Sequence, residues 1–153
     1  MTILLAVVLA ATVSDVSRLT SVKGVSIPAK VETRQLAGEW YRGDGLGYNL
    51  TLTVGEDGRY RATWNGCVGE YGRAAGTWSQ RNGHVSLSPT EETEMMVNHL
   101  RELTVVTYRG KLLLVPSGRD GNFFVEHGPS DYSCFHREAD LPHWWEDSRD
   151  EPR

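Results

Sequence analysis

The chain has 153 residues, of which 39% are hydrophobic and 24% charged, and these values indicate one globular domain rather than a disordered chain. The formal net charge is -4, and residues 138–153, with six acids and two arginines, account for all of it. The remainder is neutral and has no basic stripe, so nucleic acid is excluded as an expected partner, because phosphate binding needs clustered Lys and Arg.

An apolar, uncharged segment, Ile3–Val13, lies near the start of the chain. It is too short to cross a bilayer, which takes roughly 20 residues, but it matches the hydrophobic region of a signal peptide. We therefore expect residues 1–13 to be a signal peptide, the protein to be exported (periplasmic or secreted), and the chain to lack a membrane span. A first β-strand or an uncleaved anchor would fit the same residues.

Cys67 and Cys134 are the two cysteines of the sequence. In an exported protein they could form a disulfide that closes a long loop. Two buried free thiols would fit equally well, and the spacing does not decide between these alternatives.

The chain reaches its predicted domain through residues 14–35, a polar segment expected to be a leader or linker, in which Gly24–Pro28 has the character of an edge strand or linker. Residues 36–138 form the predicted domain. Its first half alternates polar and apolar residues between glycine turns, which predicts short strands with one wet face. The expected strands are residues 39–41, 48–54, 59–64, 70–80 and 84–88, with hairpin turns at Asp57–Gly58 and Asn82–Gly83.

The second half of the domain begins with a change of pattern. Residues 90–102 are expected to form a short helix or ordered loop, because Met96, Leu100 and Leu103 recur at helical spacing. A hairpin follows over residues 103–116, and its two partly apolar faces predict that it is central or covered. Residues 117–128 have the composition of a loop, interrupted by Phe123-Phe124-Val125, and residues 132–137 are expected to be a last strand.

These elements define a mostly β fold of about seven or eight antiparallel strands in an up-and-down meander. Such a sheet can close into a barrel, which removes its exposed edges. Residues 139–153 form an acidic tail that holds Trp144 and Trp145.

The first expected strand carries Gly38-Glu39-Trp40-Tyr41, which resembles the G-x-W motif of lipocalins and related small barrels (calycins). The resemblance implies an eight-stranded barrel with a cup for a small apolar ligand. It also implies that Trp40 packs at the closed end beneath an arginine from late in the chain, for which Arg137 is the counterpart. Ser130-Asp131-Tyr132 is similar to a second motif of that family.

Two further resemblances concern the same half of the chain. The run from Gly38 to Trp64 is similar to the opening of avidin-type barrels, but Arg42–Gly45 do not match the residues that contact biotin there. Gly43–Asn49 and Gly66–Trp78 resemble uncharacterised exported bacterial domains with G-D-G-L-G-x-N and G-C-x-G-x-Y-G-x-x-x-G-T-W segments. That resemblance implies no activity.

Aromatic side chains alternate onto one face of three successive expected strands, which predicts either a ligand cavity or a filled core. The residues expected to line a cavity are Leu52, Tyr60, Trp64, Trp78 and Leu114. If the barrel is solid, the same residues simply fill it.

The sequence contains no catalytic motif of a known kind. Asp44, Glu70 and His84 could form an acid–base set only if their loops converge, and the spacing of His127, His136 and His143 fits no metal site. We therefore expect no catalytic residues, no metal and no cofactor.

The resulting hypothesis is an exported, non-enzymatic β domain that binds a small apolar or amphipathic ligand. The alternative is a structural or protein-interaction module with a solid core. Such a module would contact a protein partner through Trp144 and Trp145 or through the Gly43–Gly47 loop.

Overall fold

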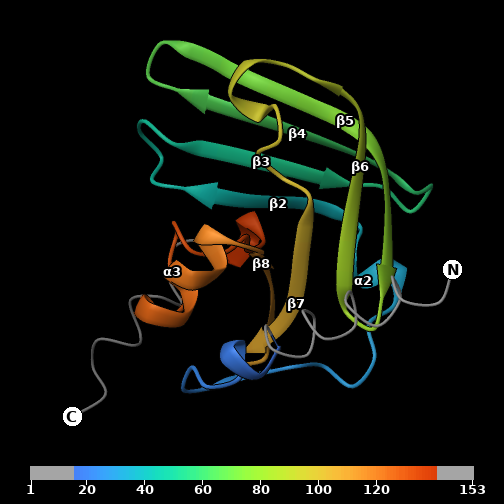
Figure 1. The fold of residues 1–153 in the computed structure, drawn as a ribbon, viewed down its shortest axis with the longest axis vertical. Coiled ribbons are helices and arrows are strands. Elements are labelled where there is room, and N and C mark those ends of the chain that lie inside the picture. Colours follow the sequence, from blue (N-terminus) through green and yellow to red (C-terminus); the bar gives the residue numbers. More distant parts are fainter. Residues whose placement is uncertain (1–15, 141–153) are drawn as a thin grey trace, which may run out of the picture.

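The computed structural model describes residues 16–140, so the expected signal peptide and the segment with Trp144 and Trp145 lie outside the described residues. The described chain is mostly β (Figure 1). Its strands are β1 (Val25–Ser26), β2 (Gly38–Gly43), β3 (Asn49–Val54), β4 (Arg59–Gly66), β5 (Gly69–Arg81), β6 (His84–Glu92), β7 (Glu102–Tyr108) and β8 (Lys111–Pro116). Residues 16–19 are helical, and further along the chain lie α2 (Thr33–Leu36), α3 (Arg119–His127) and the 3-10 turns η1 (Glu94–Met96) and η2 (Glu138–Asp140).

The strands β2 to β8 pair in sequence order, and every pairing is antiparallel. This confirms the predicted up-and-down meander, which is curled into a half-barrel (Figure 1). The added strand β1 pairs with the end of β7, so Gly24–Pro28 contributes an edge strand. Among residues 16–140, no helix is long and apolar enough to cross a membrane.

A short segment near the C-terminus joins the two edges of the half-barrel. Phe135 exchanges two backbone hydrogen bonds with Leu114 of β8, at 2.8 and 3.0 Å, and His136 exchanges two with Tyr41 of β2, at 2.8 and 3.0 Å. The last strand expected over residues 132–137 is therefore reduced to two bridging residues. We call Phe135–His136 the seam.

The hairpin turns follow from residues that tolerate positive φ. Asn82 and Gly83 have φ values of 52° and 77°, as the two-residue turn between β5 and β6 requires. Gly58 has a φ of 80° in the turn between β3 and β4. The glycine turns of the sequence therefore mark the hairpins correctly.

The sheet splits between β6 and β7. These strands pair only over His84–Ser86 and Glu102–Thr104, and residues 93–101 run between them, with η1 in contact with β5 and β4. The expected helix there is reduced to the single turn η1, but Met96, Leu100 and Leu103 are buried as the spacing indicated.

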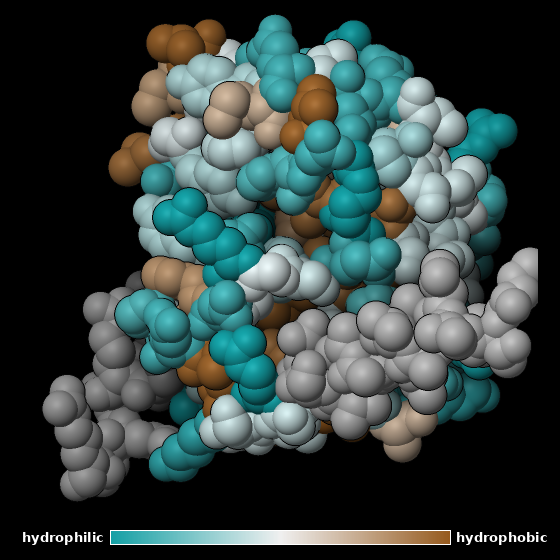
Figure 2. Space-filling view, viewed as in Figure 1, coloured by the Kyte–Doolittle hydropathy of each residue, from teal (hydrophilic) through white to brown (hydrophobic). Residues whose placement is uncertain are grey.

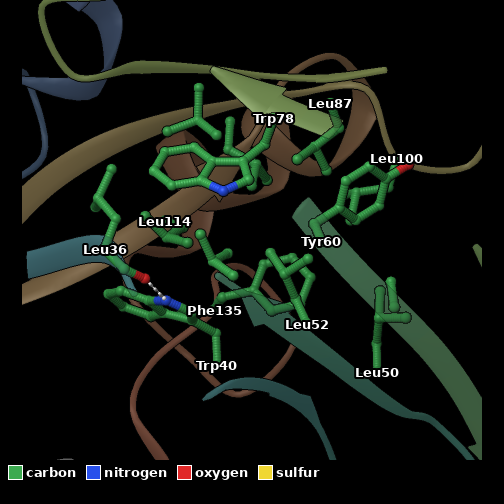
Figure 3. Packing of buried hydrophobic residues seen from close by; sticks show 14 of the residues in the cluster. Leu36, Trp40, Leu50, Leu52, Tyr60, Trp78, Leu87, Leu100, Leu114 and Phe135 are labelled. Atoms are coloured by element: carbon green, nitrogen blue, oxygen red, sulfur yellow. Dashed lines mark hydrogen bonds between the residues drawn. The ribbon is translucent and has the colours of Figure 1, made fainter. Parts of the chain in front are cut away.

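Close packing of the hydrophobic residues fills the inside of the half-barrel around Trp40, Leu52 and Trp78 (Figure 3). A second cluster lies on the outer face of β7 and β8, where Val106, Leu113 and Val115 pack against Leu19, Val25 and Phe124. The β7–β8 hairpin is therefore apolar on both faces because both faces are covered, and part of the expected leader forms one of the covers.

The loop expected over residues 117–128 is wrong, because α3 spans most of it. Gly118 and Gly128, with φ values of 78° and 76°, flank this helix. Phe124 is buried on the second cluster, so tertiary packing compensates for Gly121 and Asn122, which are weak helix formers.

Candidate functional site

Four of the five residues expected to line a cavity lie in the packed interior. Leu52, Tyr60, Trp78 and Leu114 are all buried in the main hydrophobic cluster. Trp64 differs, because it is only partly buried and lies at one end of the half-barrel. The interior around Trp78 is therefore occupied by side chains. Trp64 belongs to a different site, at the end of the half-barrel.

That site is an open cleft of about 770 Å³ at the mouth of the half-barrel. Its volume is in the range of roughly 300–1,000 Å³ that is usual for small-molecule sites. One wall consists of residues from β2–β4 and the other of residues from α3. The lining residues are Arg42, Tyr48, Trp64, His99, Ser117, Arg119, Asp120, Asn122, Phe123, Glu126 and Tyr132.

Four rings form a continuous row along the cleft. His99 lies against Trp64 with centroids 4.9 Å apart, and Tyr48 meets Trp64 edge-on at 4.9 Å. Tyr132 stacks beside Tyr48 at 6.4 Å. Burial raises the pKa of Tyr48 to about 12 and lowers the pKa of His99, and the hydrogen bond to Asp44 raises the pKa of Tyr132, so this row is uncharged at neutral pH and offers apolar faces for stacking.

Arg42 is the charged residue at the base of the cleft, and it is 4% exposed. Its Nη1 donates to Asp120 Oδ2 at 2.8 Å and its Nε donates to the Tyr132 carbonyl at 2.7 Å. Its guanidinium lies 5.5 Å from the centroid of the Tyr48 ring. Arg42 thus ties α3 and the residues before the seam to β2, and it holds Tyr48 in place.

The loop between β2 and β3 is shaped by Asp44. Its Oδ1 accepts hydrogen bonds from the Leu46 and Tyr48 amides at 2.8 and 3.0 Å, and its Oδ2 accepts one from the Tyr132 hydroxyl at 3.0 Å. These bonds hold the pKa of Asp44 below its usual range. The glycine-rich Gly43–Gly47 segment is therefore a turn that positions Tyr48 and Tyr132.

Two ring nitrogens of the cleft are buried without a hydrogen-bond partner among the described residues: Trp64 Nε1 and His99 Nε2. Such groups are uncommon in proteins, and each costs about 1–3 kcal/mol when no partner is found. Burial lowers the pKa of His99, so its ring is neutral at neutral pH.

Hydrophobic side chains stand out on the loops around this mouth. Leu46 is 74% exposed in the β2–β3 loop and Val68 is 85% exposed in the β4–β5 turn, while Met95, Val97 and Phe123 are exposed near the β6–β7 loop and on α3. In an up-and-down meander these connections all lie at one end. Figure 2 shows hydrophobic side chains protruding at that edge, and others inside the hollow between the strands and α3.

The opposite, closed end contains Trp40 and Arg137. The Trp40 ring is fully buried, and its Nε1 donates to the Leu36 carbonyl at 2.8 Å (Figure 3). The guanidinium of Arg137 lies 3.8 Å from the ring centroid and donates to the Gln35 carbonyl at 2.7 Å. A Cβ on Gly38 would lie 2.8 Å from Arg137 Nη1, so glycine is needed for this approach.

The other candidates do not converge. Glu70 lies at the start of β5, whereas His84 begins β6 beside the far end of β5, and His84 Nε2 is 2.6 Å from Glu102 Oε2. Cys67 is exposed and Cys134 is buried, and both are free thiols, so the disulfide alternative is not realised. Within residues 16–140 no group of three or more His, Cys, Asp or Glu residues is placed to hold a metal ion.

The cleft brings together residues that the sequence reasoning had not combined, namely Arg42, His99, Asp120 and Tyr132. They come from β2, the β6–β7 loop, α3 and the segment before the seam. No sequence pattern linked them, because they come from segments that lie far apart along the chain. Comparison with family models, with curated proteins and with solved structures gave no match, so the geometry alone carries the functional argument.

Proposed function

We propose that the protein is an exported, lipocalin-like, non-enzymatic protein that binds a small amphipathic molecule in the mouth cleft. The observation that carries this proposal is the row of four rings, His99, Trp64, Tyr48 and Tyr132, along a cleft of about 770 Å³. The antiparallel meander of β2 to β8 and the packing of Arg137 on Trp40 support the lipocalin-like part.

The proposed binding mode differs from a deep cup. Four of the residues expected to line a cavity pack in the core instead, namely Leu52, Tyr60, Trp78 and Leu114. Trp64 lines the cleft and contacts the ligand in this binding mode. Stacking on flat aromatic faces favours a ligand with a planar or compact apolar body. The charged pair of Arg42 and Asp120 at one side favours a ligand that also carries a polar group.

A direct test uses the uncharged fluorescent probe N-phenyl-1-naphthylamine. We expect saturable binding to the wild type and at least about tenfold weaker binding to Trp64→Ala, because one apolar face of the site is lost. Val68→Ala, which removes an exposed side chain outside the cleft, is the matched control and should bind as the wild type does. Equal binding by all three proteins, or no binding, would refute the proposal.

The alternative is a protein-interaction module with a solid core. It is favoured by the exposed Leu46 in the Gly43–Gly47 loop and by the neighbouring Val68. The two loops are in contact, since Cys67 Sγ lies 3.5 Å from the Leu46 carbonyl oxygen. Under this alternative, association of the protein with itself, measured by analytical ultracentrifugation, would be abolished in the double variant Leu46→Ser, Val68→Ser. Trp64→Ala would leave this self-association unchanged.

A further inference from the structure

Two nitrogens of the cleft, Trp64 Nε1 and Arg42 Nη2, are hydrogen-bond donors without a partner among the described residues. Trp64 Nε1 can only donate, and it has no partner among the described residues. Arg42 uses Nε and Nη1 within the protein, but its Nη2 makes no hydrogen bond to a described residue. His99 Nε2 is a third nitrogen without a partner in that part of the chain. A ligand that satisfies Trp64 Nε1 and Arg42 Nη2 has to bring an acceptor oxygen, whereas His99 Nε2 donates or accepts according to its tautomer.

The charges of the cleft are already balanced. Arg42 is paired with Asp120, with Nη1 and Oδ2 2.8 Å apart, and the remaining lining charges are Arg119 and Glu126. Desolvation lowers the pKa of the His99 ring, and the charges of Asp120 and Arg42 act on it in opposite directions, so His99 is neutral at pH 7.5. An anionic ligand would therefore add a negative charge close to Asp120 without an unpaired buried cation to receive it.

From this balance of donors and charges we infer that the cleft selects uncharged ligands that carry a carbonyl-type oxygen on an aromatic or compact apolar body, and that it discriminates against carboxylates. The oxygen accepts from Trp64 Nε1 or Arg42 Nη2, and the apolar body stacks on Tyr48 and Trp64. Trp64 Nε1 is buried in this structure, so the ligand oxygen reaches it by displacing the side chains that cover it. This inference rests on the proposed function and names the ligand class for the same cleft.

The test compares three probes that share one ring system: 2-acetylnaphthalene (uncharged acceptor), 2-ethylnaphthalene (no acceptor) and 2-naphthoate (carboxylate). Dissociation constants are measured by competition with N-phenyl-1-naphthylamine at pH 7.5. We expect the ketone to bind about tenfold more tightly than the ethyl compound, because it satisfies a buried donor. We expect the carboxylate to bind more weakly than the ketone.

Two variants assign the effect to the named groups. Trp64→Phe keeps an aromatic face and removes the N–H, so the preference for the ketone over the ethyl compound should shrink severalfold while ethyl binding changes little. Asp120→Asn keeps an oxygen for Arg42 and removes a negative charge, so binding of 2-naphthoate should strengthen about tenfold relative to the ketone. Tyr71→Phe, on β5 and outside the cleft lining, is the matched control and should change none of these ratios.

The outcomes separate this inference from the proposed function. If none of the three probes binds, the proposed function itself fails. If they bind with equal affinity, or if the ethyl compound binds best, the cleft is only an apolar site and the inference is overturned. If 2-naphthoate binds tightest to the wild type, the charge argument is overturned. Thermal unfolding of each variant checks that a changed ratio does not come from an unfolded protein.

Discussion

At the scale of single residues, the closed end depends on Arg137. Its guanidinium lies over the Trp40 ring and donates to two backbone carbonyls, those of Gln35 and Glu39. Partial burial lowers its pKa from the ordinary value, but the group stays charged at any working pH. A planar, weakly hydrated cation is therefore needed here, and an ammonium group does not replace it.

Arg137→Lys keeps the charge but loses the flat stacking on Trp40 and the geometry of the two hydrogen bonds. We expect the free energy of unfolding, measured in urea, to fall by about 1–2 kcal/mol. Arg61→Lys on the exposed side of β4 is the matched control and should change stability by less than about 0.5 kcal/mol. A loss in the Arg137 variant no larger than in the control would show that the stacking does not contribute.

At the scale of elements, the loop of residues 93–101 connects β6 to β7 and packs through η1 on β5 and β4. Arg101 forms a bidentate pair with Glu92 at the end of β6, with Nη2 and Oε2 2.8 Å apart, and it also donates to Asn98 Oδ1 at 2.9 Å. The Asn98 amide donates to Glu92 Oε2 at 3.3 Å. The same loop places His99 on Trp64, so this pair indirectly supports the cleft.

The pair makes the order of this loop depend on pH. The hydrogen bonds from Arg101, and then from Asn98, hold the pKa of the Glu92 carboxyl below its usual range. A carboxyl whose pKa is lower in the folded state stabilises that state above its unfolded pKa, and the contribution is lost as pH falls through the folded pKa. We expect the Asn98 amide resonance to report this loss in an NMR titration below about pH 4.5.

Glu92→Gln should remove that titration and, because the pair is partly exposed, lower the free energy of unfolding at pH 7 by only about 1 kcal/mol. Glu91→Gln, on the neighbouring residue of β6, is the matched control and should leave the Asn98 titration in place. An unchanged titration in the Glu92 variant would assign the pH dependence to another group.

The elements differ in how well the sequence predicted them. Strands β3, β4 and β5 were predicted because each has one buried and one wet face, so that a period of two is visible. Helix α3 was missed because its signal, Gly118 and Gly128 around nine residues, is weak and its stability comes from burial of Phe124 against distant segments. The cleft was missed for a related reason.

Trp64 was correctly singled out from the alternation in β4, but its neighbours in the cleft come from segments far away in sequence. His99 lies in the loop between β6 and β7, and the sequence singled out Arg42 only as a position that does not match the avidin-type biotin contacts. No short-range pattern brings Arg42 to Asp120, which is 78 residues away. Residues that fill a core and residues that line a cleft also show the same alternation of polar and apolar residues along a strand, so this pattern does not distinguish them.

At the scale of the whole molecule, the seam turns an open meander into a closed unit. An open antiparallel sheet exposes two rows of unpaired backbone groups at its edges. Here Phe135 satisfies groups of β8 and His136 satisfies groups of β2. The alternation of a strand is kept across this short segment, because Phe135 packs in the main cluster and Cys134 in the second one.

Phe135 is therefore expected to matter more for stability than its place in a short connecting segment suggests. Its side chain is fully buried, so Phe135→Ala leaves a cavity in the main cluster and should lower the free energy of unfolding by about 3–5 kcal/mol. Phe123→Ala, at an exposed position of α3, removes the same atoms and should change stability by less than about 0.5 kcal/mol.

A second measurement separates the loss of packing from the opening of the seam. If the seam protects the edges of β2 and β8, Phe135→Ala should increase amide hydrogen exchange at Tyr41 and Leu114, whose N–H groups donate to it. It should also promote self-association under native conditions, because freed edges pair with other chains. Destabilisation with unchanged exchange at these two amides would mean that Phe135 only fills the core and that the edges stay joined without it.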